Sequence, residues 1–212
     1  MTPLRTTIAL CLAFVAVVLG MFVYTRLQEP VLSDAELRDR GVLVLPTPRE
    51  IAPFALTDHR GRPFGVDDLT GHWSFLFFGF TNCPDICPTS MAVLAQAERR
   101  LQEEHPQLAD EFQGILVSVD PERDDQQTLA NYVEAFSPDF LGVRGELAAT
   151  AAFTTQVNVA FAKVPAGDGG YQVDHSANIV IVNPRGHYHG FVKMPHDADT
   201  IVETFRSLHA RM

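Results

Sequence analysis

Two cysteines four residues apart, Cys83 and Cys87, are the side chains whose type and spacing best suit chemistry. They directly follow an apolar run at 73–80, and a helical pattern begins at Pro88, so we expect them at a strand-to-helix junction. Residues four apart share one face of a helix, so the two sulfurs are expected to converge. A helix N-terminus stabilises negative charge, so both are expected to be thiolates. Two thiolates suit Cu(I), and less selectively Zn(II), or they can close to a disulfide. The spacing is one residue longer than the C-x-x-C of thiol oxidoreductases.

A metal ion would need a further ligand beside the two sulfurs, unless it were linear Cu(I). The best candidate is His175, which lies 88 residues after Cys87 at the start of a predicted strand. By position alone, a surface-loop histidine without a role is the default interpretation. His187 and His189 form a second pattern, H-x-H, whose rings would share one face of a strand. Polar residues on a half-exposed strand explain that pattern better than a metal site does.

Two aspartates, Asp120 and Asp124, follow the second predicted buried strand, 112–119. Ligands in open α/β sheets gather at the carboxyl ends of strands, so Asp120 is expected near Cys83. Either carboxylate is therefore a candidate for orienting a metal ligand. The alternative is that Asp124 or Asp125 caps the helix predicted at 126–136.

The elements that must position these residues alternate along the chain. Apolar runs and the turn signature at 183–186 predict strands at 73–80, 112–119, 159–164, 177–182 and 186–192. Helical periodicity predicts helices at 88–104, 126–136, 146–157 and 198–209. This order predicts an α/β, thioredoxin-like fold with a mixed central sheet flanked by helices.

The N-terminal segment differs from the rest in composition. Residues 8–24 carry no charge and lie between Arg5 and Arg26, which predicts a transmembrane anchor over 1–26, with a cleaved signal peptide as the alternative. Prolines and mixed charge predict a linker at 27–49, and 50–212 is the predicted folded domain. The net charge of −10 is unfavourable for nucleic acid, because phosphate contacts need clustered Lys and Arg.

Four stretches of the chain, taken in order, resemble the Sco/SenC family of copper-binding, thioredoxin-fold proteins. They are Gly79-Phe-Thr-Asn-Cys83-Pro-Asp-Ile-Cys87-Pro88, Ser118-Val-Asp-Pro-Glu-Arg-Asp124, Ala135-Phe-Ser-Pro-Asp139 and Val173-Asp-His-Ser176. The resemblance implies Cys83 and Cys87 as copper thiolates and His175 as the third ligand. It implies Cu(I), and also Cu(II), carried to the CuA centre of cytochrome c oxidase subunit II, with other copper chaperones as further partners. It also implies a membrane-anchored protein whose soluble domain lies in the bacterial periplasm or the mitochondrial intermembrane space.

Three functions compete for the cysteine pair. A copper metallochaperone would use two thiolates and an imidazole in an open site that releases its metal by ligand exchange. A membrane-anchored thiol–disulfide oxidoreductase that reduces the CuA-site cysteines would use a redox-active Cys83–Cys87 pair and would not need His175. A thiol peroxidase is disfavoured, because the proline expected before its reactive cysteine is missing here. We therefore expect mainly a metal-binding assembly factor, with thiol–disulfide exchange as the alternative activity.

Overall fold

A computed structural model describes residues 3–27, 31–166 and 169–212, and the chain divides into two compact units, Met1–Val31 and Leu32–Met212. The first unit contains helix α1 (Pro3–Leu27). Among the described residues, no helix is both long enough and apolar enough to cross a membrane. The transmembrane anchor predicted over 1–26 stays a prediction.

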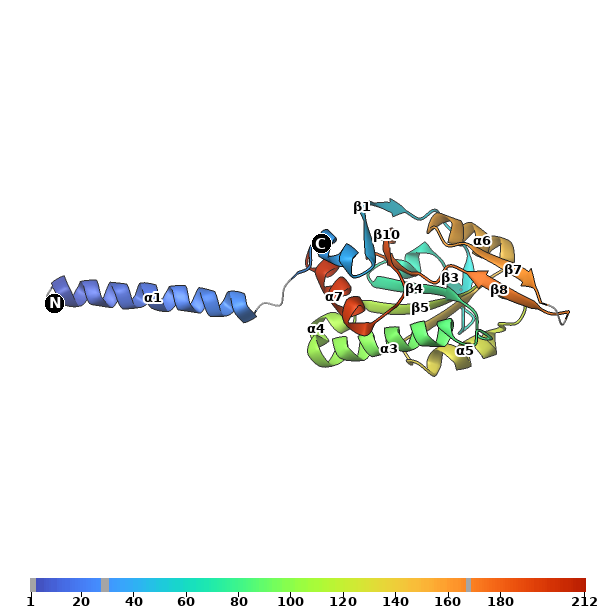
Figure 1. Ribbon diagram of the computed structural model, residues 1–212, viewed down its shortest axis with the longest axis horizontal. Helices are drawn as coiled ribbons and strands as arrows, with labels where there is room; N and C mark the ends of the chain where they lie inside the picture. The colour runs from blue at the N-terminus through green and yellow to red at the C-terminus, as the bar shows by residue number, and fades with distance from the viewer. Residues whose placement is uncertain (1–2, 28–30, 167–168) are drawn as a thin grey trace. The chain divides into compact units, whose positions relative to one another are not determined.

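The second unit is built on an eight-stranded mixed sheet (Figure 1). Its strands, in spatial order, are β1 (Val42–Glu50), β10 (His187–Val192), β9 (Ile179–Val182), β4 (Trp73–Gly79), β5 (Phe112–Ser118), β6 (Leu141–Arg144), β2 (Leu56–Asp58) and β3 (Pro63–Phe64). Strands β4, β5 and β6 run parallel, whereas β9 lies antiparallel to β4. Helices join the consecutive parallel strands, because such strands need long crossover connections. The predicted α/β class with a mixed central sheet is confirmed.

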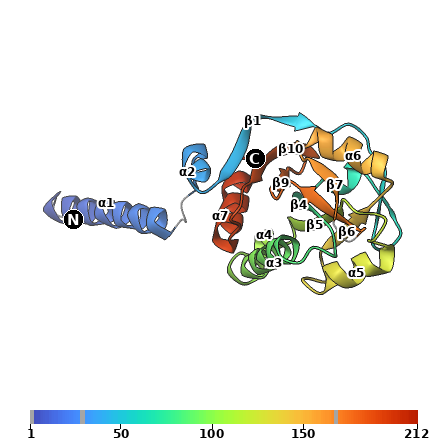
Figure 2. The same ribbon diagram turned by 45° about the vertical axis from the view of Figure 1, so that its right-hand side comes forward.

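Helices cover both faces of this sheet. The longer ones are α3 (Ile86–Glu104), α5 (Gln126–Glu134), α6 (Leu147–Gln156) and α7 (Ala198–His209), and the short ones are α2 (Asp34–Asp39), α4 (Pro106–Ala109) and the 3-10 helix η1 (Val66–Leu69). Helices α3 and α7 lie side by side (Figure 2). On their side of β4, Phe75 stacks on Phe112, which meets Phe205 of α7. On the other side, Phe78 packs against Phe153 of α6, and this double coverage explains why β4 is apolar at successive positions.

The segment for which the sequence predicts a linker, 27–49, contains two elements of the folded domain. Helix α2 begins after Ser33, whose hydroxyl accepts from the Glu36 N–H while the Glu36 carboxylate accepts from the Ser33 N–H. Strand β1 pairs with β10 at the edge of the sheet. An edge strand tolerates prolines, because a missing N–H there interrupts no central ladder. The compact domain thus starts at Leu32, earlier than the predicted boundary at residue 50.

A separate two-stranded hairpin carries the candidate histidine. Strands β7 (Phe161–Pro165) and β8 (Tyr171–His175) pair antiparallel, with Phe161 opposite His175. In the part of the chain that the structure describes, this hairpin forms its own sheet, outside the eight-stranded one. The short connection to β9 and the side-chain contacts of the hairpin with the rest of the domain together determine where the imidazole lies.

Candidate metal centre

The cysteine pair lies at the predicted junction of a strand and a helix. Strand β4 ends at Gly79 and α3 begins at Ile86, so Cys83 lies in the connecting loop and Cys87 in the first turn of the helix. Cys83 is half-buried, whereas Cys87 is buried in the core. The Cys87 N–H donates a hydrogen bond to Cys83 Sγ at 3.4 Å, so the first turn of α3 holds the two sulfurs close together.

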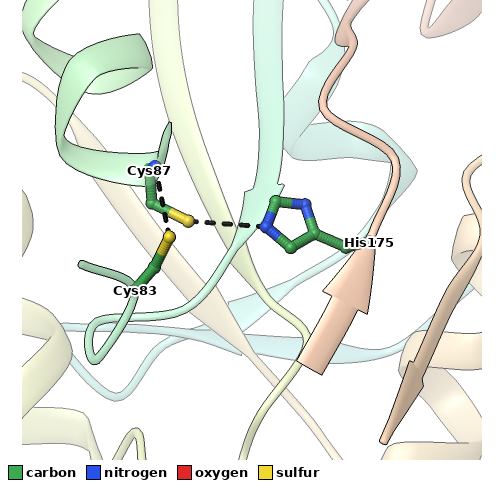
Figure 3. Close-up of side chains that lie close together, drawn as sticks. All are labelled: Cys83, Cys87 and His175. Carbon is green, nitrogen blue, oxygen red and sulfur yellow. Dashed lines mark hydrogen bonds between the residues drawn. The ribbon is translucent and has the colours of Figure 1, made fainter. Parts of the chain in front are cut away.

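His175 ends strand β8 and its ring faces the cysteine pair (Figure 3). The Nε2 atom lies 3.6 Å from Cys87 Sγ. The Nδ1 atom lies 3.2 Å from the Ser176 carbonyl oxygen, so an N–H there leaves the Nε2 lone pair directed at the sulfurs. Phe77 and Phe80 pack edge-on against the imidazole, with ring centroids 5.7 and 5.8 Å away. These contacts set both the tautomer and the orientation of the ring.

The ligand atoms of the three residues converge. Cys83, Cys87 and His175 each offer one atom, and these atoms all lie within 4.8 Å of one another. Among the described residues, this is the one group of three or more His, Cys, Asp or Glu side chains with such geometry. Two sulfurs and one imidazole nitrogen form a soft, open donor set that fits Cu(I) and, less selectively, Zn(II). The structure thus brings together the three residues that the sequence resemblance implies as ligands.

Burial shifts the protonation of two of these side chains. Desolvation raises the pKa of the Cys87 thiol far above its usual value, and its contact with the Cys83 thiol adds to the rise. The prediction that both sulfurs are thiolates is therefore wrong for Cys87 in the metal-free protein, because burial outweighs the field of the helix N-terminus. Burial also lowers the pKa of His175, which keeps the imidazole neutral and its lone pair available at pH 7. A metal ion must consequently displace the Cys87 proton when it binds.

A groove of about 260 Å³ opens beside Cys83 and His175. Its lining includes the apolar Phe80, Ile86 and Val173 together with the exposed carboxylates of Asp85 and Asp174. Negative charge at this opening favours the approach of a cation or of a basic partner surface. The site is therefore accessible from outside the domain.

Asp124 is fully buried beneath the cysteine loop. Its carboxylate accepts hydrogen bonds from the hydroxyls of Thr81 and Ser118, both at 2.6 Å, and from the Thr81 N–H at 3.2 Å. Thr81 lies two residues before Cys83, so Asp124 holds the start of the cysteine loop. The helix cap proposed as an alternative belongs to Asp125, whose carboxylate accepts from a backbone N–H of α5 at 2.7 Å.

Asp120 is also fully buried, and it contacts the other half of the site. It forms an ion pair with Arg123 and accepts a hydrogen bond from the Tyr171 hydroxyl at 2.7 Å. Tyr171 begins strand β8, which ends at His175. The two aspartates after β5 therefore bind different parts of the centre, one the cysteine loop and the other the histidine hairpin.

The H-x-H pattern on β10 does not converge with a third ligand in the described part of the chain. His189 packs edge-on against Trp73, and its Nδ1 lies 3.1 Å from Asn183 Nδ2. Burial lowers the pKa of His189 to about 4, so its ring is neutral at pH 7. His189 serves in packing, which agrees with the interpretation that the sequence favoured over a metal site.

The sequence assigned no role to three residues of the centre: Phe80, which packs against the His175 ring, and Arg123 and Tyr171, which join the loop after β5 to strand β8. Strand β8 is short and polar at alternate positions, so the sequence suggests a loop there. Tyr171, Val173 and His175 nevertheless alternate along it, and this period of two is the signal that could have identified a strand.

Comparisons with known proteins agree on one family. The SCO1/SenC family model matches residues 45–210. The Mus musculus Protein SCO2 homolog, mitochondrial, is 39% identical over 154 residues, which are 72% of this chain and 60% of the mouse protein. The structure of Arabidopsis thaliana ScoI with copper bound is 31% identical with a TM-score of 0.69, covering 75% of this chain and 98% of that one. Bradyrhizobium japonicum ScoI with copper bound is 33% identical with a TM-score of 0.66, covering 74% and 98%.

These likenesses confirm the predicted thioredoxin-like fold of the Sco type, and they extend over most of the domain that carries the cysteine pair and the histidine hairpin. The family match over residues 45–210 covers well over half of the chain. The chain belongs to the SCO1/SenC family.

Proposed function

We propose that this chain binds copper through Cys83, Cys87 and His175 and delivers it as a metallochaperone. The observation that carries the proposal is the convergence of two sulfurs and one imidazole nitrogen within 4.8 Å. Thiolates suit Cu(I), and the imidazole adds a nitrogen ligand of the kind that Cu(II) prefers. The copper-bound structures of two relatives support the same cargo.

The geometry favours release of copper as well as binding. Three ligands leave coordination positions open to a donor atom of the partner protein. Cys83 borders the groove and is half-buried, whereas Cys87 is in the core, so an incoming ligand displaces Cys83 first. When copper leaves, Cys87 takes up a proton, because burial raises the pKa of its thiol. This protonation favours completion of the transfer.

An anaerobic Cu(I) titration against bicinchoninate tests the copper proposal. The full chain carrying Cys11→Ser, which removes the exposed third thiol, is expected to bind one Cu(I). Cys83→Ala should weaken binding more than about 100-fold, since changes around metal ligands alone cost about 10–100-fold. His187→Ala is the matched control, because it removes an imidazole that does not belong to the convergent group. Unchanged Cu(I) affinity in Cys83→Ala would reject the proposal.

We further propose the CuA centre of cytochrome c oxidase subunit II as the recipient, and the periplasm or intermembrane space as the location of the domain. Family membership and the mitochondrial name of the mouse relative support this. Attachment to the membrane through residues 8–24 rests on their uncharged sequence alone. Cells that lack the protein should assemble oxidase without the CuA absorption. The wild-type chain should restore that absorption and Cys83→Ala should not.

A thiol–disulfide oxidoreductase is the second candidate, and the asymmetry of the two thiols favours it. Cys83 is the more accessible of the two sulfurs, and it accepts a hydrogen bond from the Cys87 N–H. Both features suit a sulfur that attacks a partner disulfide. Cys83 would attack a partner disulfide to form a mixed disulfide. Cys87 would then displace the partner's thiolate, leaving an oxidised Cys83–Cys87 pair and a reduced partner.

Two variants separate these candidates. Cys87→Ser should trap the mixed disulfide if the exchange reaction occurs. His175→Ala should weaken Cu(II) binding far more than Cu(I) binding and leave disulfide reduction intact, because the exchange uses only the two sulfurs. If His175→Ala keeps both its copper affinity and oxidase assembly, the chaperone proposal fails.

A further inference from the structure

The hairpin that carries His175 is joined to the main sheet by the short connection to β9, and side chains hold its other end. Strands β7 and β8 form a sheet of their own, so their ladder sets the shape of the hairpin and not its distance from the cysteine loop. Val173 contributes apolar packing, since it is buried in the core. The polar contacts that join the hairpin to the loop after β5 gather around Tyr171, at the opposite end of β8 from His175.

Asp120, Arg123 and Tyr171 form this cluster, which we call the hairpin clamp. The Tyr171 hydroxyl donates to Asp120 Oδ1 at 2.7 Å, and Arg123 Nε donates to Asp120 Oδ2. Arg123 Nη1 donates to the Tyr171 carbonyl oxygen at 3.4 Å, and the guanidinium lies 4.2 Å from the centre of the Tyr171 ring. Asp120 is fully buried, so these charge-assisted bonds are shielded from water and strengthened by their low-dielectric surroundings.

The clamp also reaches the imidazole through an aromatic ring. The Arg123 guanidinium lies 5.5 Å from the centre of the Phe80 ring, and Phe80 packs edge-on against His175. Tyr171 and His175 share one face of β8, because they are an even number of residues apart. Arg123 therefore constrains His175 both along the strand and across Phe80.

The loop after β5 connects the two halves of the centre. Asp124 binds Thr81 at the start of the cysteine loop, and Asp120, four residues earlier, binds Tyr171 in the hairpin. Both carboxylates are fully buried. The backbone between them thus sets the spacing between the sulfurs and the imidazole.

We propose that the hairpin clamp makes the centre sensitive to the oxidation state of copper, by holding His175 within reach of a Cu(II) ion bound at the two cysteines. This inference rests on the proposed copper function. Two thiolates satisfy a linear Cu(I) ion, whereas Cu(II) prefers a larger set that includes nitrogen. A released hairpin loses the imidazole, so Cu(II) binding weakens far more than Cu(I) binding. Asp120, Arg123 and Tyr171 are positioning residues for this selectivity.

Tyr171→Phe tests the clamp, because it removes one hydroxyl and keeps the ring beneath Arg123. In the full chain carrying Cys11→Ser, Cu(II) affinity should fall about 10–100-fold. Cu(I) affinity should stay within about threefold of the parent value. The sulfur-to-Cu(II) charge-transfer band should shift or weaken. In the metal-free protein, amides of β8 should exchange hydrogen faster, because the hairpin opens more often.

Tyr188→Phe is the matched control, since it removes a buried tyrosine hydroxyl on β10, a strand that carries none of the three ligands. Both copper affinities should be unchanged in this control. Arg123→Lys keeps a charge beside Asp120 but loses the planar stacking on Tyr171, so it should show the same selective loss. This second variant keeps the clamp testable if Tyr171→Phe does not fold.

Two results would overturn the clamp: equal loss of Cu(I) and Cu(II) affinity in the clamp variants, or an unchanged Cu(II) affinity and spectrum. Failure of the parent chain to bind either ion would instead reject the proposed function itself. The measurements on the parent chain and on the variants therefore distinguish the two failures.

Discussion

Replacement of Asp124 by alanine is expected to destabilise the domain by about 3–5 kcal/mol. The buried carboxylate accepts three hydrogen bonds, from the N–H and hydroxyl of Thr81 and from the hydroxyl of Ser118. A buried donor that loses its acceptor costs about 1–3 kcal/mol, so three donors set a range of about 3–9 kcal/mol. Local relaxation and entry of water favour the lower half of that range. This loss is a large fraction of the free energy of unfolding of a typical domain, which is about 5–15 kcal/mol.

Urea unfolding, followed by the fluorescence of the chain's single tryptophan, the buried Trp73, measures this change. Thr81→Val removes only the 2.6 Å hydroxyl bond and should cost about 1–2 kcal/mol. A double-mutant cycle of Asp124→Asn with Thr81→Val should give a coupling of at least about 0.5 kcal/mol, because the side chains are in contact. Asp125→Ala is the matched control, since it removes an exposed helix cap worth about 1 kcal/mol.

The reasoning is refuted if Asp124→Ala costs no more than Asp125→Ala. That result would mean that the three donors find other partners at little cost. Copper affinity provides a second check, because Asp124→Asn should weaken Cu(I) binding about tenfold by loosening the loop before Cys83. Asp125→Ala should leave Cu(I) affinity at the wild-type value.

Three further predictions concern protonation and packing. Burial lowers the pKa of His189 from 6.5 to about 4. The stability that the folded domain gains from keeping this ring neutral is therefore fully present above pH 6.5 and is lost as the pH falls towards 4. The shift corresponds to about 3 kcal/mol, or about 2 kcal/mol once the partial exposure of the ring is discounted. His189→Gln should therefore flatten the pH profile of the urea midpoint between pH 6.5 and 4, and parallel profiles would contradict this. Gly79→Ala would place a Cβ 2.8 Å from Cys87 Sγ, so it should cost about 1–3 kcal/mol and weaken Cu(I) binding, whereas wild-type values for both would show that the packing can adjust. Alkylation of the metal-free chain should modify Cys83 much faster than Cys87, because burial shields the Cys87 thiol and raises its pKa; peptide mass spectrometry measures both rates, and similar rates would count against the burial.

The cysteine half of the centre was predictable from the sequence, because it is local. The apolar run of β4 predicts a strand covered on both faces, and the helical period after Pro88 predicts the helix that follows. Two sulfurs four residues apart at that junction can be brought together by backbone geometry alone. By contrast, the sequence predicts a linker where β1 lies, because pairing at a sheet edge leaves little signal in a strand that contains prolines.

Only the tertiary structure decided that His175 faces the sulfurs and that the Cys87 thiol keeps its proton. Among the eight histidines, position made His175 the best candidate for a third ligand, but a surface-loop histidine without a role remained the default interpretation until the family resemblance was considered. The His175 ring lies 3.6 Å from Cys87 Sγ, although the two residues are 88 positions apart in sequence. The separate hairpin, which Tyr171 and Arg123 join to the loop after β5, brings them together. A helix N-terminus by itself predicts a thiolate at Cys87. The opposite shift arises because residues from other elements remove that sulfur from water, and sequence spacing does not record such burial.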